Sequence, residues 1–306
     1  MDKSAVTLER MRIFVRIAER GNLSAVAREM GLGQSTVTRQ LALLEQAVGV
    51  PLIARTTRTI ALTGEGARYY DECLQILRLI DQAGEEARTA RDAPAGTVRL
   101  SCPAAFGVLR ICPLIFAFQD RYPDIRVDLD LTDQRVDLIA EGFDLAVRLG
   151  PLTESSLRLK PLGISHRVMV ASPAYLARHG RPDRPSDLTR HEGLRMSNVA
   201  GSDRLLFDGP DGRGEAVPFS GRLLVDHGLA LREAFIAGRG IGPAHRWLIQ
   251  DLLEDGRLEV VMADYRLTPV PLNLLLAPER AAISRVRLLA DFLAGSTQGI
   301  PGVSRP

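Results

Sequence analysis

The first sixty residues alternate short stretches of helical hydrophobic spacing with glycine-containing breaks. Apolar residues recur every three or four positions in three stretches, and two short β-like runs follow them. Ser24 is the expected N-cap of the second stretch, and Val37, Leu41 and Leu44 face inward on the third. The pattern predicts three helices and a hairpin, over residues 8–18, 24–31, 34–47 and 52–62.

A single helix without proline is expected over residues 65–91. Its apolar positions repeat every seven residues in two interleaved rows, which is typical of a short coiled coil. The rows are Tyr70, Leu77 and Gly84, and Cys73, Ile80 and Ala87. A seam this narrow is expected to need a partner helix, so the segment is predicted to be a dimerisation element. Residues 92–96, with Pro94 and Gly96, then end the helix and mark a domain boundary.

Beyond this break, strand and helix patterns alternate, which is typical of an α/β domain with a mostly parallel sheet. The first unit contains strands at 98–101, 126–131 and 144–149, with helices at 104–121 and 134–141. The second contains strands at 167–171, 223–225 and 258–262, with helices at 173–179 and 228–237. A strand at 272–276 and a helix at 283–293 are assigned back to the first unit. The chain would then cross between two lobes near 163–166 and 265–268.

Composition restricts the class of protein. The chain has 306 residues, 45% of them hydrophobic and 25% charged, as expected of a multidomain globular protein. It contains no apolar run long enough to span a bilayer, and its N-terminus lacks the apolar core of a signal peptide, which favours the cytoplasm. The three cysteines contain no CxxC pair, which argues against a disulfide framework and a thiolate metal site. Residues 1–66 hold nine basic and six acidic side chains, a balance compatible with DNA contact.

The segment 23–42 meets the steric demands of a helix-turn-helix at the required offsets. Ala27 lies where two helices approach, Gly31 takes the turn, and Val37 packs the second helix on the first. The opposite face of the second helix carries polar side chains suited to a major groove. These are Gln34, Ser35, Thr36, Thr38 and Arg39. The alternative is a surface helix pair that binds nothing.

A longer series of motifs is similar to one protein family. The runs are NLSAVAREM (22–30), QSTVTRQL (34–41), GVPL (49–52) and RTTR (55–58), followed by SCP (101–103), RYP (121–123), EGFDLAVRLGP (141–151) and ASPAYL (171–176). Their ordered combination resembles the LysR-type transcriptional regulators over roughly residues 7–295. Two positions depart from the family pattern. Ile53 stands where phenylalanine is usual, and residues 240–245 lack the usual LLP-type sequence.

The resemblance implies a multidomain α/β protein that regulates transcription and is not an enzyme. Residues 1–64 would form a winged helix-turn-helix, 65–92 a linker helix and 93–306 an effector-binding domain. That domain would have two lobes, about 97–164 with 268–295 and about 165–267, similar to periplasmic solute-binding proteins. Arg55 and Arg58 of the wing would contact phosphates, and a homodimer or homotetramer would bind operator DNA.

In the first lobe, the effector site is expected where a strand meets a helix, because free amides there favour anions. This junction contains Ser101, Cys102, Pro103 and Ala104. Arg148, at another strand end, would be either a carboxylate clamp or an internal salt-bridge partner.

In the second lobe, His227 lies at an equivalent junction, and Ser197 with Asn198 forms a further polar group. All these residues would otherwise be helix caps and nothing more. The helix ends favour an organic acid as effector.

Other chemistry finds less support in the sequence. The glycines of residues 238–242 have the wrong spacing for a dinucleotide site, and the five histidines lack metal-ligand spacing, so no cofactor or metal is expected. Redox sensing would need a resolving partner for Cys102. A solute-binding protein or an α/β enzyme would explain only the C-terminal two-thirds, and an architectural DNA-binding protein only the N-terminus.

Overall fold

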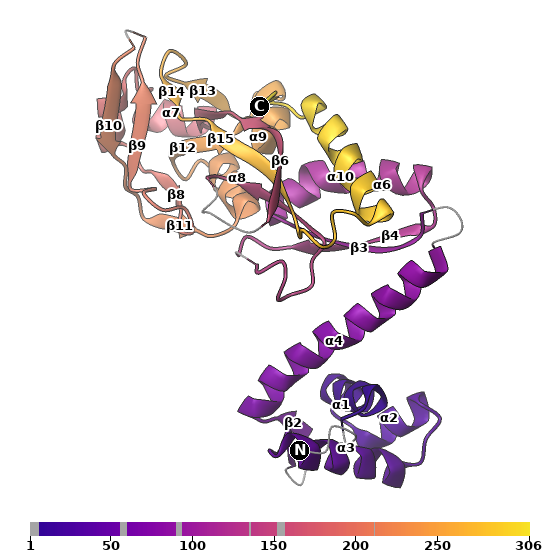
Figure 1. Ribbon diagram of the computed structural model, residues 1–306. Helices are drawn as coiled ribbons and strands as arrows, with labels where there is room; N and C mark the ends of the chain where they lie inside the picture. The colour runs from indigo at the N-terminus through magenta and orange to yellow at the C-terminus, as the bar shows by residue number, and fades with distance from the viewer. Residues whose placement is uncertain (1–5, 56–59, 90–93, 135, 152–156, 211) are drawn as a thin grey trace. The chain divides into compact units, whose positions relative to one another are not determined.

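A computed structural model describes residues 6–55, 60–89, 94–134, 136–151, 157–210 and 212–306 (Figure 1). Its contacts divide the chain into two units, Met1–Asp92 and Ala93–Pro306. None of the described helices is both long enough and apolar enough to cross a membrane.

The N-terminal unit consists of a three-helix core, a hairpin and a long helix. Its elements are α1 (Leu8–Arg20), α2 (Leu23–Glu29), α3 (Gln34–Val48), β1 (Ile53–Arg55), β2 (Ile60–Leu62) and α4 (Gly64–Thr89). The expected N-cap of α2 is wrong. Asn22, not Ser24, caps this helix, because its side-chain oxygen accepts hydrogen bonds from the amides of Ser24 at 2.9 Å and Ala25 at 3.1 Å.

The first half of α4 packs against α1 of the same chain. Cys73 and Leu77 are buried in the core shared with α1. The centroid of the Phe14 ring lies 5.9 Å from that of Tyr69 and 6.5 Å from that of Tyr70. The expectation that this stripe is too narrow for a globular core is therefore wrong for this half. Its partner helix is α1, because Phe14 provides an apolar surface that matches the narrow seam.

Lobe I of the C-terminal unit is built on a six-stranded sheet in the order β16-β6-β15-β5-β3-β4. The strands are β3 (Gly96–Cys102), β4 (Ile125–Leu131), β5 (Leu145–Leu149), β6 (Arg158–Ser165), β15 (Val270–Leu276) and β16 (Val303–Ser304). The strand β3 is parallel to β4 and β5, whereas β15 is antiparallel to β5 and β6. The late strand β15 thus returns to lobe I as predicted, but it makes the sheet mixed rather than mostly parallel.

A nearly continuous helical run follows β3, formed by α5 (Ala104–Phe106), the π-helix η1 (Gly107–Ile111) and α6 (Cys112–Arg121). The final helix α10 (Ser284–Ser296) lies beside α6 (Figure 1). The helix expected over 134–141 is wrong, since residues 138–142 form turns and residues 136–137 have no regular structure. The Asp137 carboxylate accepts hydrogen bonds from the amides of Ile139 and Ala140, both at 3.0 Å, and this local turn competes with a helix.

Lobe II contains three small sheets. In one, β7 (Arg167–Ala171) lies between β12 (Ile241–His245) and β13 (Glu259–Val261), antiparallel to both. The others pair β8 (Leu194–Met196) with β11 (Leu223–Val225), and β9 (Arg204–Asp208) with β10 (Gly214–Pro218) and β14 (Arg266–Leu267). The helices are α7 (Pro173–His179), α8 (Gly228–Ile236) and α9 (Arg246–Glu254), with 3-10 turns η2 (Pro185–Arg190) and, in the C-terminal segment, η3 (Thr297–Gly299). The expected parallel arrangement is wrong here except for β8 and β11.

The sequence pattern did not predict β12, which contains two residues that are uncommon in strands, Gly242 and Pro243. Gly242 is required in this strand because a Cβ atom there would lie 2.7 Å from the Leu194 carbonyl oxygen.

The chain passes from lobe I to lobe II at His166, between β6 and β7, and returns between β14 and β15.

Candidate DNA-binding face and effector cleft

Helix α3 presents one polar face away from the core of the N-terminal unit. Val37, Leu41 and Leu44 are fully buried on its inner face. On the outer face, Gln34, Ser35 and Arg39 are exposed, and Thr36 and Thr38 are partly exposed. The turn before α3 depends on Gly31, whose φ of 65° is one that a glycine adopts without strain. All five candidates from this helix therefore lie at its solvent-facing side.

A carboxylate that sequence reasoning missed fixes the base of the wing. Glu45, near the end of α3, accepts hydrogen bonds from the amides of Leu52 at 2.9 Å and Ile53 at 3.1 Å. Ile53, which replaces the usual phenylalanine, is buried in the same core. The side chain of Arg55 and the whole of Arg58 lie outside the described residues.

The junction between the wing and α4 is closely packed. The Thr63 hydroxyl donates to the Pro51 carbonyl at 2.8 Å and accepts from the Gly66 amide at 2.8 Å. A Cβ atom on Gly66 would lie only 1.9 Å from the Leu52 carbonyl oxygen. Only glycine allows α4 to begin this close to the wing.

In lobe I, the candidate effector residues surround a buried serine. Ser101 is fully buried, and its hydroxyl accepts a hydrogen bond from Arg148 Nη2 at 3.0 Å. Arg148 Nη1 donates to its neighbour, the Val147 carbonyl, at 3.0 Å. Among the described residues, no carboxylate forms an ion pair with Arg148, and burial lowers the pKa of its guanidinium. Within the described part of the chain, the hydrogen bonds of this guanidinium go to neutral acceptors, and the carboxylates of Asp130, Asp133 and Glu141 act on it only through their charge.

The other lobe I candidates offer backbone and shape rather than charge. Cys102 is fully buried, and burial raises the pKa of its thiol well above the ordinary range, which disfavours the reactive thiolate. Pro103 is the N-cap residue of α5, without a side-chain capping bond, and Ala104 is buried.

In lobe II, the candidates lie at the ends of β8 and β11. Ser197 and Asn198 are exposed. The Ser197 amide donates to the Val225 carbonyl at 2.8 Å, and Asn198 Nδ2 donates to the Asp226 carbonyl at 2.9 Å. His227 is the N-cap of α8, with Nδ1 accepting from the Leu229 amide at 3.2 Å.

The two lobes approach each other at the start of α5 and α8. A Cβ atom on Gly228 would lie 2.9 Å from the Cβ atom of Ala105. This contact brings the neighbouring candidates Ala104 and His227 to the same interlobe region.

Asp133 is a further residue of this interlobe region that sequence reasoning missed. Burial raises the pKa of its carboxyl, and His227 and the Ala104 amide act in the opposite direction. Its Oδ2 atom is buried and has no hydrogen-bond partner among the described residues. An acidic residue two positions after the end of β4 was the available signal, since strand ends of this kind line the crevice.

Comparison with known proteins assigns both units to one family. Residues 8–67 match the family described as "Bacterial regulatory helix-turn-helix protein, lysR family". Residues 91–298 match the family described as "LysR substrate binding domain". The chain belongs to the LysR family. It is a DNA-binding transcription regulator with an effector-binding domain. This assignment decides against a separate solute-binding protein and against a purely architectural DNA-binding protein.

Related LysR-type proteins align along nearly the whole chain. An HTH-type transcriptional regulator of Xanthomonas campestris pv. campestris (strain 8004) is 32% identical over 286 residues, covering 92% of this chain and 83% of that protein. The full-length structure of the Vibrio cholerae virulence activator AphB has 27% identity and a TM-score of 0.66, covering 95% and 99%. CrgA of Neisseria meningitidis has 29% identity and a TM-score of 0.62, with the same coverage.

Proposed function

We propose that α3 reads operator DNA in the major groove through Gln34, Ser35, Thr36, Thr38 and Arg39. The supporting observation is that all five lie on the exposed side of a helix whose opposite side is fully buried. Arg39 is the long cationic donor among them, so it can reach a guanine edge or a phosphate. Arg55 and Arg58 of the wing would neutralise phosphates.

Binding to operator fragments selected from random sequence tests this proposal. Arg39→Ala should weaken binding by about 1–3 kcal/mol if Arg39 reads a base. Arg28→Ala, on the exposed part of α2, is the matched control, since it removes the same charge from a neighbouring helix. Equal losses in the two variants would indicate general electrostatic attraction rather than reading by α3.

We further propose that the effector is a small organic anion bound between the lobes. The observation that carries this is the guanidinium of Arg148, which is partly buried and, among the described residues, hydrogen-bonded to the Ser101 hydroxyl and the Val147 carbonyl without an ion pair. A guanidinium whose hydrogen bonds go to neutral acceptors can still bind a carboxylate in direct contact. Ser101 would orient Arg148, and Cys102, Pro103 and Ala104 would line the site.

The lobe II side of this site would be provided by Ser197, Asn198 and His227. Asp133 lies near the same region and opposes an anion by its charge. Two variants therefore distinguish the charge of the effector. For an anion, Arg148→Met should abolish binding and Asp133→Asn should preserve or strengthen it; for a cation, the order reverses.

The sole tryptophan, Trp247, contacts Phe106 of lobe I at 4.9 Å between ring centroids, so its fluorescence reports on the interface between the lobes. A panel of mono- and dicarboxylates, titrated while this emission and the melting temperature are followed, tests the proposal. An effector that binds Arg148→Met as well as it binds the unaltered protein would refute the assigned site.

We also propose that the chain acts as a homodimer, paired into a tetramer, in the bacterial cytoplasm and on the nucleoid. The exposed Leu79 of α4, 55% accessible, supports dimerisation through the part of this helix beyond its contact with α1. In this proposal, residues 1–64 form the DNA-binding domain, 65–92 the linker helix and 93–306 the effector-binding domain. The chain would regulate transcription and would not catalyse a reaction.

A further inference from the structure

The first turn of α9 belongs to lobe II but is hydrogen-bonded to lobe I. The Arg246 amide donates to the His166 carbonyl at the crossing point at 3.1 Å. The indole Nε1 of Trp247 donates to the Ser165 hydroxyl at 3.0 Å. The Trp247 carbonyl accepts from Arg110, whose Nε and Nη2 lie at 2.9 and 2.6 Å. Three separate groups of lobe I or the crossing segment therefore bond two consecutive residues.

Ser165 is also hydrogen-bonded to His245. This histidine is the last of residues 240–245, where the chain departs from the family pattern. Ser165 is fully buried, and its hydroxyl lies 2.8 Å from His245 Nδ1. The hydroxyl therefore bonds both the indole N–H of Trp247 and the imidazole of His245. Burial lowers the pKa of His245 to about 3, so the ring is neutral near pH 7 and the bond persists there.

The C-terminal segment closes over the same place. Strand β16 pairs with β6 at Ser165, and the His166 amide donates to the Gly302 carbonyl at 2.8 Å. Gly302 has a φ of 69°, and a Cβ atom on it would lie 2.3 Å from the Cβ atom of Arg246. The tail thus packs against both the crossing segment and the start of α9.

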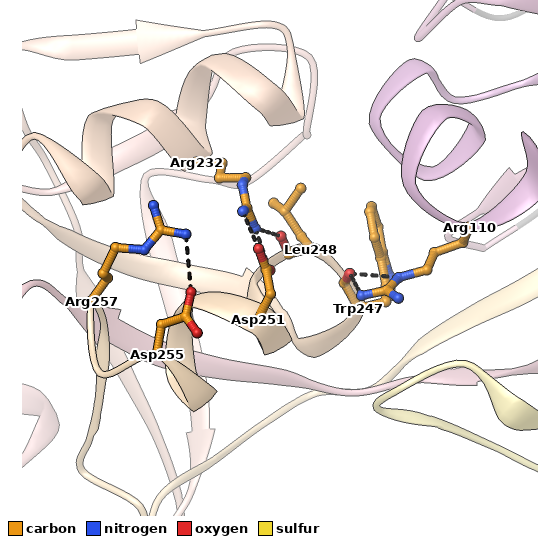
Figure 2. A network of polar contacts seen from close by, with 7 residues as sticks. All are labelled: Arg110, Arg232, Trp247, Leu248, Asp251, Asp255 and Arg257. Atoms are coloured by element: carbon orange, nitrogen blue, oxygen red, sulfur yellow. Dashed lines mark hydrogen bonds and ion pairs between the residues drawn. The ribbon is translucent and has the colours of Figure 1, made fainter. Parts of the chain in front are cut away.

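A second arginine bonds the same turn without crossing between lobes. Figure 2 shows Arg110 and Arg232 meeting neighbouring carbonyls from opposite sides in this view. Arg232, on α8 of lobe II, donates to the Leu248 carbonyl at 2.6 Å and pairs with Asp251. An arginine therefore donates to a backbone carbonyl of this turn twice, once across the lobes from Arg110 and once within lobe II from Arg232.

We propose that Arg110, Ser165, His166 and the first turn of α9 form a cross-lobe lock that sets the relative orientation of the two lobes. We call this set the α9 lock. Arg110 is a positioning residue, because its planar donor fork holds the Trp247 carbonyl of lobe II from the π-helix of lobe I. The role in regulation rests on the proposed binding of an effector between the lobes, because lobe orientation would then determine the shape of that site.

Amide hydrogen exchange of the full-length protein without ligand tests the lock. Arg110→Met should raise exchange at the Arg246 amide, which donates across the lobes to the His166 carbonyl, by about tenfold or more, because it removes both hydrogen bonds from Arg110 to the neighbouring Trp247 carbonyl. Trp247 emission should shift to the red as water reaches the indole. Arg232→Met, the matched control, should raise exchange in α8 and in the later turns of α9 but leave the Arg246 amide within twofold of the unaltered protein.

Two results would overturn the proposal. One is unchanged exchange at the Arg246 amide in Arg110→Met, and the other is an equal increase at this amide in both variants, which would indicate general loosening of α9. If Arg110→Met does not fold, Arg110→Lys provides the test, since its single donor should give a smaller increase at the same amide. The exchange experiment uses no ligand, so a negative result would overturn the α9 lock without bearing on the proposed effector. If instead no anion binds, the proposed effector is wrong and the exchange result still stands.

Discussion

Replacing Leu77 by alanine separates folding from dimerisation in α4. Leu77 is 8% exposed and belongs to the core that contains Phe14 of α1. The substitution removes about three carbon atoms from this core, worth roughly 2.4 kcal/mol at about 0.8 kcal/mol per carbon. A cavity would add to this loss, but Leu77 lies near the edge of the core, where neighbours can relax. We expect a loss of about 2–3 kcal/mol in the unfolding free energy of the N-terminal unit.

The assay is urea unfolding at several protein concentrations. Far-UV circular dichroism would follow both units, and emission of the single tryptophan, Trp247, would follow the C-terminal unit alone. Leu79→Ala is the contrasting variant, because Leu79 is 55% exposed on the same helix and belongs to the proposed dimer contact. At concentrations where the chain is monomeric it should change stability by less than about 0.5 kcal/mol, whereas it should raise the dimer dissociation constant. The reasoning is refuted if Leu77→Ala leaves the N-terminal transition unchanged while it raises the dimer dissociation constant. That result would mean that Leu77 contacts a partner chain rather than α1.

Two further predictions concern a close contact and the half-buried His245. Gly66→Ala should destabilise the N-terminal unit by at least about 1–3 kcal/mol and weaken operator binding, because the new methyl group would overlap the Leu52 carbonyl. Gly64→Ala has open space and should be neutral or stabilising, so equal urea midpoints for the two variants would contradict this packing. The pKa of His245 falls from 6.5 to about 3 on folding, so below pH 6.5 the unfolded chain binds a proton that the folded chain does not. The unfolding free energy is therefore unaffected by protonation of His245 above pH 6.5. It should fall by up to about 1.4 kcal/mol per pH unit as the pH drops from 6.5 toward 3. His245→Asn should reduce this slope in urea titrations at pH 7.5 and 5, and an unchanged slope would show that His245 is protonated in the folded protein.

The sequence by itself determined the features that depend on neighbours close in the chain. The offsets of Ala27, Gly31 and Val37 predicted the helix-turn-helix, because helix spacing and turn geometry are local properties. The same spacing identified the inward and outward faces of α3, so its five DNA-binding candidates lie on the exposed side. The assignment of β15 to lobe I also followed from the alternating pattern, since too little chain remained after lobe II to form another sheet.

Local pattern was misleading where a side chain competed with the backbone. Residues 134–141 have helical spacing, yet the Asp137 carboxylate bonds the amides of Ile139 and Ala140 and forms a turn. The strand β12 was missed because Gly242 and Pro243 are uncommon in strands. What selects glycine there is the approach of another strand, which no local pattern contains.

Tertiary structure alone decided which surfaces meet. The heptad seam of α4 indicates that some helix covers it, but only the folded unit shows that α1 covers its first half. Arg110 and Trp247 are 137 positions apart, and Asp133 lies near His227 across the lobes. Spacing along the chain describes one element at a time, whereas these contacts depend on how separate elements pack, and packing is set by the whole core at once.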